Sequence, residues 1–441
     1  MAERSEPATI LIRGGRVIDP ASGRDELADV LVMYGRIADV GAGIRRATDR
    51  TIDAAGLVVC PGFIDIHVHL REPGQERKET IRTGARAAAA GGFTTVCAMP
   101  NTEPPLDTRA ACEFVVDQGR RAGGARVLPI GCVSKGRRGE ELAELGDLAA
   151  GGACAFSDDG DPVRTAALMH RALLYAAMLD RVVIDHCEDP TLSAGGQMHA
   201  GVVSAELGLQ GKPGVSEDVI VARDLLLAEA CGTRVHIAHL STARSLALVR
   251  EARRRGVRAS CEVTPHHLLL TDEQVRAFDA AAHKMNPPLR SEADRQALLQ
   301  GLADGTIDCV ASDHAPHSQE DKEREWDLAP CGVIGLETTW PVIYTELVET
   351  GVISLSRAVE LLTVGPVRCL GLDADSQLEA SSGTLARGAA ADLVVFDPAT
   401  PFTLGASGFY SAARNSPFAG REVRGRIRYT LVGGRVVHEA D

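Results

Sequence analysis

The sequence predicts an α/β fold, in which a TIM-type (β/α)8 barrel is joined to a small β-sandwich domain formed by both termini. Between about Phe63 and Cys309, short apolar β-branched runs alternate with Ala- and Leu-rich amphipathic stretches, a pattern typical of repeated βα units around a parallel sheet. About eight such runs occur, the number that a closed TIM-type barrel needs. The two flanks differ, because they are rich in Gly and Val and contain short alternating strands.

Each predicted barrel strand is short and apolar, and helical patterns such as Lys78–Ala90 and Pro162–Leu179 separate the strands. At 441 residues and 45% hydrophobic, the chain can bury one large core and a smaller second module. The strands are expected near Phe63–His69, Phe93–Ala98, Arg126–Cys132, Ala153–Ser157, Val182–His186, Arg234–His239, Arg258–Val263 and Ile307–Ser312.

The second module is predicted from the two flanks, Ala8–Thr51 and Gly383–His438, which carry turn signals between short strands. Their ends resemble each other, with ILIRGGRVID near the start and YTLVGGRVVH near the finish. We therefore expect residues 1–60 and 373–441 to form one non-contiguous β-sandwich, and residues 61–372 to form the barrel.

Charge and composition favour a small-molecule enzyme over a nucleic-acid or membrane protein. The net charge is −13, and no basic block is longer than Arg253–Arg255, which is expected to be a solvated face. No stretch approaches the roughly 20 apolar residues of a membrane helix, and no export signal is visible. The eleven Cys occur singly and never as C-x-x-C. We expect a soluble, cytoplasmic protein with reduced, mostly buried thiols.

The first predicted barrel strand carries the first candidate metal ligands. Strict alternation from Phe63 places Asp65, His67, His69 and Arg71 on one face of the strand and the aliphatic side chains on the other. A lone His is more often a hydrogen-bonded core residue, but a His-x-His pair at a strand end favours metal binding.

Further ligand-type residues end later strands: Asp158 follows CAFS, His186 follows VVID, His239 follows VHIA and Asp313 follows CVAS. All of them fall where the carboxyl ends of barrel strands are expected, and TIM-barrel active sites are built on that rim. Imidazole and carboxylate ligands suit zinc or a similar divalent ion. The sequence therefore predicts a metal site on the rim.

With these residues the chain resembles the amidohydrolase superfamily, and within it the bacterial dihydroorotases that stand apart from the carboxylated-lysine enzymes. The resemblance covers essentially the whole chain. It rests on PGFIDIHVHLREPG (61–74), AMPNTEPP (98–105), FSDDG (156–160), HCED (186–189), HIAHLST (236–242), CEVTPHHL (261–268), KMNPPLR (284–290), ASDHAPH (311–317) and PCGVIGLET (330–338).

The resemblance implies one or two Zn2+ ions. His67, His69 and Asp313 would hold one metal, and His186 and His239 a second. Asp158 would bridge them, in the place where most relatives have a carboxylated lysine in the fourth strand and this chain has no lysine. Zinc, manganese and cobalt all accept such ligands, so the metal and the number of ions stay open.

The resemblance also implies the reaction, which is the reversible hydrolysis of the ring amide of (S)-dihydroorotate to N-carbamoyl-L-aspartate in pyrimidine synthesis. Attack on an unactivated amide at neutral pH needs an activated water, and a metal lowers the pKa of water from about 15.7 to about 7. Asp313 is predicted to accept the proton and to return it to the departing ring nitrogen.

Several other residues are predicted to bind the substrate. Arg71 offers a planar fork suited to a carboxylate, which indicates an acidic ring rather than a neutral one. The loop Ala329–Gly335 is a candidate lid. His266 and His267, by contrast, are expected to be structural and to stabilise a loop through hydrogen bonds. By resemblance, substrate contacts would also come from His69, Asn101, Asn286 and His317, and from the main chain of Cys331 and Gly332. Nothing in the sequence pairs the Cys331 thiol with a base, so Cys331 is expected to be a loop residue and not a nucleophile.

Two other functions stay open. A hydantoinase, dihydropyrimidinase or allantoinase would share the barrel and the His-x-His strand, although Arg71 and the missing fourth-strand lysine count against it. A non-catalytic scaffold for aspartate transcarbamoylase would be expected to lose metal ligands, which this chain retains. A homodimer is the default assembly, and aspartate transcarbamoylase is a candidate partner.

Overall fold

A computed structural model describes residues 8–372 and 383–440. Its larger unit is a barrel of eight parallel strands in the order β15-β14-β13-β10-β9-β8-β7-β6. The barrel closes where Val68 bridges His314 and the His69 amide donates to the His314 carbonyl at 2.8 Å. The strands are β6 (Phe63–Val68), β7 (Phe93–Ala98), β8 (Arg126–Cys132), β9 (Ala155–Ser157), β10 (Val183–Asp185), β13 (Arg234–Ile237), β14 (Arg258–Val263) and β15 (Cys309–Val310). The predicted barrel is confirmed.

Helices follow the strands, and hydroxyl side chains begin several of them. The hydroxyls of Thr80, Thr108, Thr165 and Thr242 each accept a hydrogen bond from the backbone three residues on, so the helices begin just after them. The α-helices are α1 (Ile81–Ala90), α2 (Arg109–Ala122), α3 (Leu145–Ala150), α4 (Ala166–Met178), α5 (Val202–Leu207), α6 (Val215–Cys231), α7 (Ala243–Arg254), α8 (Pro265–Leu269), α9 (Ala280–His283), α10 (Glu292–Ala303), α11 (Gln319–Lys322), α12 (Thr339–Ile343), α13 (Leu355–Leu362) and α14 (Val364–Leu370). The 3-10 helices η1 (Lys135–Arg137) and η2 (Asp272–Ala277) and the π-helix η3 (Tyr344–Val348) complete the helical elements.

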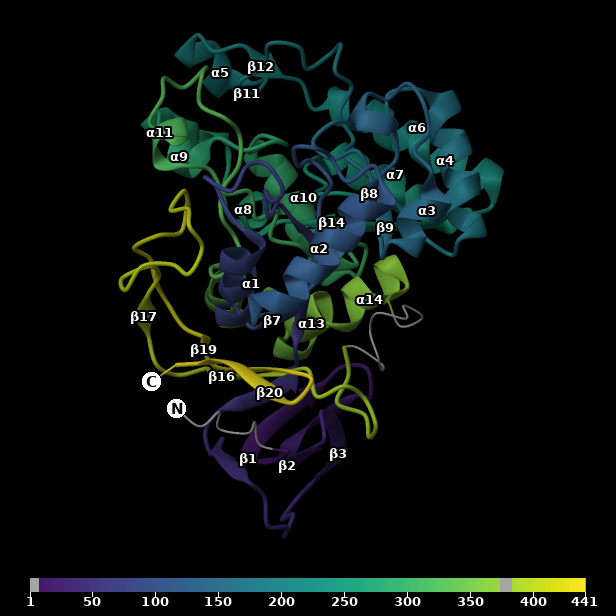
Figure 1. Cartoon of the computed structure of the whole chain (residues 1–441). Coiled ribbons are helices and arrows are strands. Elements are labelled where there is room, and N and C mark those ends of the chain that lie inside the picture. Colours follow the sequence, from purple (N-terminus) through teal and green to yellow (C-terminus); the bar gives the residue numbers. More distant parts are fainter. Residues whose placement is uncertain (1–7, 373–382, 441) are drawn as a thin grey trace.

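Both ends of the chain form a second sheet below the barrel (Figure 1). Its order is β20-β19-β16-β5-β1-β2-β3, with β4 also paired to β1. A bulge between Ile12 and Gly15 lets β1 pair first with β4 and then with β5, so the sheet bends around an apolar core. The strands are β1 (Thr9–Asp19), β2 (Arg24–Met33), β3 (Arg36–Gly41), β4 (Arg50–Asp53), β5 (Val58–Pro61), β16 (Leu393–Asp397), β19 (Arg426–Val432) and β20 (Arg435–Glu439). The predicted unit built from both termini is confirmed.

One part of the C-terminal region lies elsewhere. The segment Pro401–Val423 leaves the sheet after β16, forms the short pair β17 (Phe402–Thr403) and β18 (Glu422–Val423), and runs up beside the barrel (Figure 1). Leu404 and Phe418 bury against Met285 and Val342 of the barrel unit. The predicted boundary at residue 373 lies outside the described residues.

Another excursion follows β10, where β11 (Met198–His199) and β12 (Gly211–Lys212) pair above the rim (Figure 1). The eleven cysteines all lie within the described residues and none of them forms a disulfide; nine of them are buried. Within residues 8–372 and 383–440, no helix has both the length and the apolar character needed to cross a membrane.

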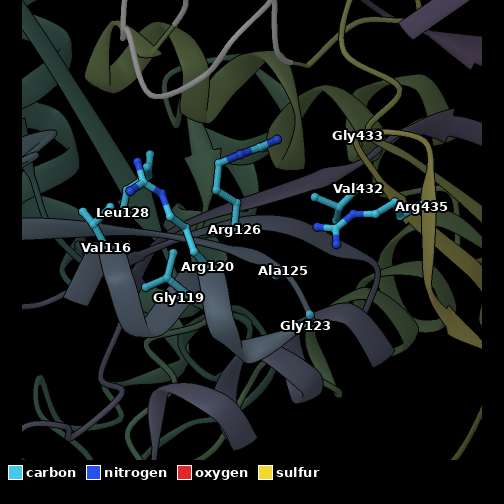
Figure 2. A pocket seen from close by; sticks show the side chains of 12 residues that line it. Val116, Gly119, Arg120, Gly123, Ala125, Arg126, Leu128, Val432, Gly433 and Arg435 are labelled. Carbon is cyan, nitrogen blue, oxygen red and sulfur yellow. The ribbon is translucent and has the colours of Figure 1, made fainter. Parts of the chain in front are cut away.

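A cavity of about 430 Å³ lies between the amino end of β8, the end of α2 and the β19–β20 hairpin (Figure 2). Arg120, Arg126 and Arg435 are among its lining residues, which include no histidine and no carboxylate. A catalytic metal centre therefore has to be sought at the opposite, carboxyl end of the barrel strands.

Candidate metal centre and active site

Four histidines meet around one carboxylate at the carboxyl ends of the strands. The Asp159 side chain, just after β9, lies 3.4 Å from His67 Nε2 and 3.5 Å from His69 Nε2. It lies 3.5 Å from His186 Nδ1 and 3.4 Å from His239 Nε2. Strands β6, β9, β10 and β13 each deliver part of this cluster, because neighbouring parallel strands end on the same rim.

Asp313 completes the cluster from the end of β15. Its Oδ1 lies 3.1 Å from His69 Nε2 and 3.7 Å from His67 Nε2. Asp313 and His239 have positive φ values of 46° and 28°, which non-glycine residues rarely adopt. Such backbone strain persists where the surrounding structure holds it, and it concentrates at functional sites.

Asp158 does not reach this cluster, and here the structure corrects the sequence analysis. Its Oδ1 accepts hydrogen bonds from the backbone amides of Val133 and Ser134, both at 3.0 Å, and its Oδ2 accepts one from the Ser134 hydroxyl. The strand ends at Ser157, so the two-residue alternation no longer decides which of two adjacent aspartates faces the axis. Asp159 is the carboxylate between the histidines.

The donor set suits a divalent cation. Among the described residues, the buried atoms His67 Nε2 and Asp159 Oδ1 have no hydrogen-bond partner. Donor atoms of His67, Asp159 and His239, and of His67, His69 and Asp313, lie within 4.8 Å of one another. Burial alone would raise the pKa of Asp159, but the surrounding histidines hold it well below its usual range. Nitrogen and carboxylate donors of this kind match zinc.

Glu262, on β14, orients the cluster, and the sequence analysis missed it. Its Oε1 lies 2.6 Å from His67 Nδ1 and accepts a hydrogen bond from the His239 amide at 3.2 Å. A proton on His67 Nδ1 leaves Nε2 free to face Asp159, which is the usual role of a carboxylate behind a metal-binding histidine. The available signal was the single acidic residue of the predicted strand Arg258–Val263, close to the carboxyl end of that strand.

A cavity of about 250 Å³ opens onto this cluster. Its walls bring together the predicted substrate-binding residues with Asp159, His186, His239 and Asp313. The predicted residues that line it are His69, Arg71, Asn101, Asn286, His317, Cys331 and Gly332.

Arg71 is a buried cation in that cavity. Its Nε donates to the Pro316 carbonyl at 3.2 Å, and its Nη2 lies 3.4 Å from His317 Nε2. Burial lowers the pKa of Arg71 to about 10, so the guanidinium stays charged at neutral pH. A positive φ of 64° helps to turn the chain at this residue.

The two asparagines contact metal-site histidines directly. Asn101 Oδ1 lies 2.8 Å from His69 Nδ1, and the Asn286 amide lies 3.1 Å from His186 Nε2. Lys212, from β12, donates to Asn286 Oδ1 at 2.9 Å and also lines the cavity. Nothing in the sequence singled out Lys212, because a lone lysine outside any recognisable motif has no pattern around it.

The loop that carries Cys331 and Gly332 lies against His317. His317 Nε2 is 2.8 Å from the Cys331 carbonyl, and Gly332 has a φ of 133°. A Cβ at Gly332 would lie 2.8 Å from the Ala315 carbonyl, so the close approach requires glycine.

Behind the cavity, His267 bonds Thr264 Oγ1 at 2.7 Å and the Pro287 carbonyl at 3.0 Å, in keeping with the expected bracing role. His266 is buried beside it, with their ring centroids 4.6 Å apart, and is not among the cavity-lining residues.

Comparisons by sequence point in one direction. A family model described as dihydro-orotase-like matches residues 56–245. The chain is 53% identical over 428 residues to a dihydroorotase of Pelotomaculum thermopropionicum, covering 97% of this chain and 98% of the relative. It is 51% identical over 432 residues to a dihydroorotase of Anaeromyxobacter sp. strain K, covering 98% of each chain.

Comparison of solved structures finds the same fold in hydantoinases. An L-hydantoinase (dihydropyrimidinase) from Arthrobacter aurescens superimposes with a TM-score of 0.85 at 28% identity, covering 98% of this chain and 96% of the other. A D-hydantoinase superimposes with a TM-score of 0.81 at 27% identity, covering 98% and 95%.

Proposed function

The chain belongs to the dihydroorotase family, and from this premise we propose how its rim residues carry out the reaction. It is a metal-dependent cyclic amide hydrolase that interconverts (S)-dihydroorotate and N-carbamoyl-L-aspartate, the third step of pyrimidine synthesis. The proposed residue roles rest on one observation: most of the candidate metal ligands and the buried Arg71 guanidinium line the same cavity.

The metal we propose is zinc, in one or two ions per chain. His67, His69 and Asp313 would hold one ion, His186 and His239 the other, and Asp159 would bridge them. Support comes from the unpartnered buried atoms His67 Nε2 and Asp159 Oδ1, which a cation would satisfy. When bound, zinc would supply Lewis acidity and lower the pKa of a water molecule to about 7.

The protein's own residues orient the ring. The Arg71 fork would bind the substrate carboxylate in bidentate fashion. Asn286 and the backbone of Cys331 and Gly332 would hold polar groups of the ring, since they line the same small cavity. A cavity of about 250 Å³ suits a single substituted six-membered ring and leaves little room for bulk water.

Asp313 would move the proton. Its carboxylate lies beside His69 on the rim and lines the cavity, so it can reach both a water and the ring. It would take a proton from the attacking water and give it to the ring nitrogen as the C–N bond breaks, first as general base and then as general acid. The product then carries a new carboxylate and a ureido group.

The test is turnover of the zinc-loaded protein on L-dihydroorotate beside hydantoin, dihydrouracil and allantoin. Arg71→Ala should lower kcat/KM for dihydroorotate at least about a hundredfold, the loss expected for a buried charge-assisted contact. Arg82→Ala, at an exposed position on α1, is the matched control and should change little.

Preference of the wild-type protein for a neutral ring would instead support a hydantoinase-like activity, which the solved relatives make the second candidate. If the zinc-loaded protein hydrolyses none of the four compounds, the result would favour a non-catalytic scaffold for aspartate transcarbamoylase.

We propose further that the protein is a cytoplasmic homodimer with aspartate transcarbamoylase as a candidate partner. Support comes from α4 and α6, which pack side by side and expose Leu174, Met178, Val219 and Leu226. Exposed apolar side chains on adjacent helices are typical of interaction surfaces. Light scattering of the wild type and of Leu226→Glu tests self-association, and a monomeric wild type would contradict it.

A further inference from the structure

The excursion of the C-terminal segment reaches the rim at Ser411–Asn415, here called the rim brace. Ser411 and Asn415 are only 1% and 4% exposed, although the segment has no regular secondary structure there. Irregular segments usually lie on the surface, because buried backbone groups need partners. The burial of these two polar side chains therefore calls for a structural or functional reason.

Asn415 joins two loops that line the cavity. Its Nδ2 donates to the Gly332 carbonyl at 3.0 Å and to the Ala315 carbonyl at 3.2 Å. Its Oδ1 accepts from the His317 amide at 3.3 Å, and its backbone carbonyl accepts from the Ile334 amide at 2.8 Å. One side chain thus satisfies groups on both loops.

The other end of the rim brace is anchored beside Asp313. Glu79, buried in the loop after β6, accepts hydrogen bonds from the Ser411 hydroxyl and from the Ala412 amide at 3.2 Å. The same carboxylate lies 3.4 Å from Nε2 of His314, the residue after Asp313. Nδ1 of His314 in turn accepts from the Gly335 amide at 3.2 Å.

The loop that carries Cys331 and Gly332 is also fixed from its far side. The ammonium of Lys322 donates to the Pro330 and Gly332 carbonyls, both at 3.0 Å. Lys322 and Asn415 therefore both bond the carbonyl of Gly332. A shift of about 1 Å in a positioned group can cost about a hundredfold in rate, so such double anchoring has a direct catalytic value.

We propose that Asn415 is a positioning residue for substrate recognition: it sets the backbone of Gly332 and His317 in the geometry that binds the ring. The inference rests on the proposed function for its kinetic consequence. Its structural content, that Asn415 orders the loop 329–335, stands independently.

The kinetic test compares three variants of the full, zinc-loaded chain. Asn415→Leu removes all side-chain hydrogen bonds at similar volume, and Asn415→Asp keeps the acceptor for the His317 amide but loses both N–H donors. Ser416→Ala is the control, because the hydroxyl it removes bonds locally to the Phe418 amide. We expect KM for dihydroorotate to rise about tenfold in Asn415→Leu and at least as much in Asn415→Asp, whose second carboxylate oxygen would face the carbonyls of Ala315 and Gly332, with kcat changed less than about threefold.

A second readout does not depend on activity. Hydrogen exchange of the peptide 329–335 should be at least about tenfold faster in Asn415→Leu than in wild type, with the barrel strands unchanged. If the wild type fails to turn over dihydroorotate, the proposed function fails and exchange alone decides the role of Asn415. If hydrogen exchange becomes faster throughout Asn415→Leu, that variant is unfolded, and the exchange of peptide 329–335 in Asn415→Asp then tests the role of Asn415. Unchanged exchange of 329–335 in the deciding variant would overturn the proposal, as would an unchanged KM in an active enzyme.

Discussion

At the scale of single residues, the site depends on one aspartate of an adjacent pair. Asp159 faces four histidines, whereas Asp158 is held by two backbone amides and a hydroxyl of the neighbouring strand end. Each carboxylate therefore has a separate task, one beside the candidate metal ligands and one in fixing the backbone on which Asp159 sits.

Because the two aspartates have different roles, we expect different effects from replacing each of them by asparagine. Asp159→Asn should reduce the zinc content and should lower kcat/KM by at least about a hundredfold, because it removes the negative charge of the carboxylate between the histidines. Asp158→Asn keeps an acceptor for the backbone amides and should retain the metal. Metal content by mass spectrometry and turnover measure both, and full zinc occupancy in Asp159→Asn would refute the bridging role.

At the scale of elements, the excursion Pro401–Val423 connects the terminal sheet to the rim. Besides the rim brace, Glu337 at the start of the α12 region accepts hydrogen bonds from the Tyr410 and Ser411 amides at 3.0 and 3.1 Å. Burial raises the pKa of Glu337 from its usual 4.5 to about 7. We therefore expect the attachment of this excursion to depend on pH.

The direction of this pH dependence follows from the linkage between proton binding and folding. Because the folded state binds this proton more tightly than the unfolded state, the contribution of Glu337 is present below pH 4.5 and is lost as the pH rises through about 7. We expect Glu337→Gln to lose less thermal stability between pH 5 and pH 8 than the wild type. Melting temperatures at the two pH values measure this, with the exposed Glu325→Gln as control. An equal loss in wild type and Glu337→Gln would contradict it.

At the scale of the whole molecule, the candidate metal site joins distant parts of the chain. Its candidate ligands come from β6, from the ends of the neighbouring strands β9, β10 and β13, and from the end of β15, which lies next to β6 only because the barrel closes. A cation that binds only the folded arrangement stabilises the closed barrel by mass action.

Removal of the metal should therefore lower the melting temperature. We expect a decrease of at least about 4 °C after dialysis against a chelator, and recovery when zinc is restored. Calorimetry with metal content measured in parallel checks this. A melting temperature that stays the same after proven loss of the metal would show that the ligand cluster does not bind a stabilising ion.

The eight barrel strands, the second sheet built from both ends of the chain and most of the cavity-lining residues could be predicted from the sequence. Alternation from Phe63 onward identified His67, His69 and Arg71, and His186, His239 and Asp313 were identified because each directly follows a predicted barrel strand. These features are local, because a repeating side-chain pattern within one strand reports which face is buried.

The side-chain contacts beyond the strand ends could be found only in the three-dimensional structure. Asp159 rather than Asp158, Glu262 behind His67, Lys212 beside Asn286 and the rim brace at Asn415 all depend on contacts between segments far apart in the chain. Irregular backbone has no period, so the direction of a side chain there is set by the partners that satisfy its hydrogen bonds and charge, and those partners exist only once the barrel has closed.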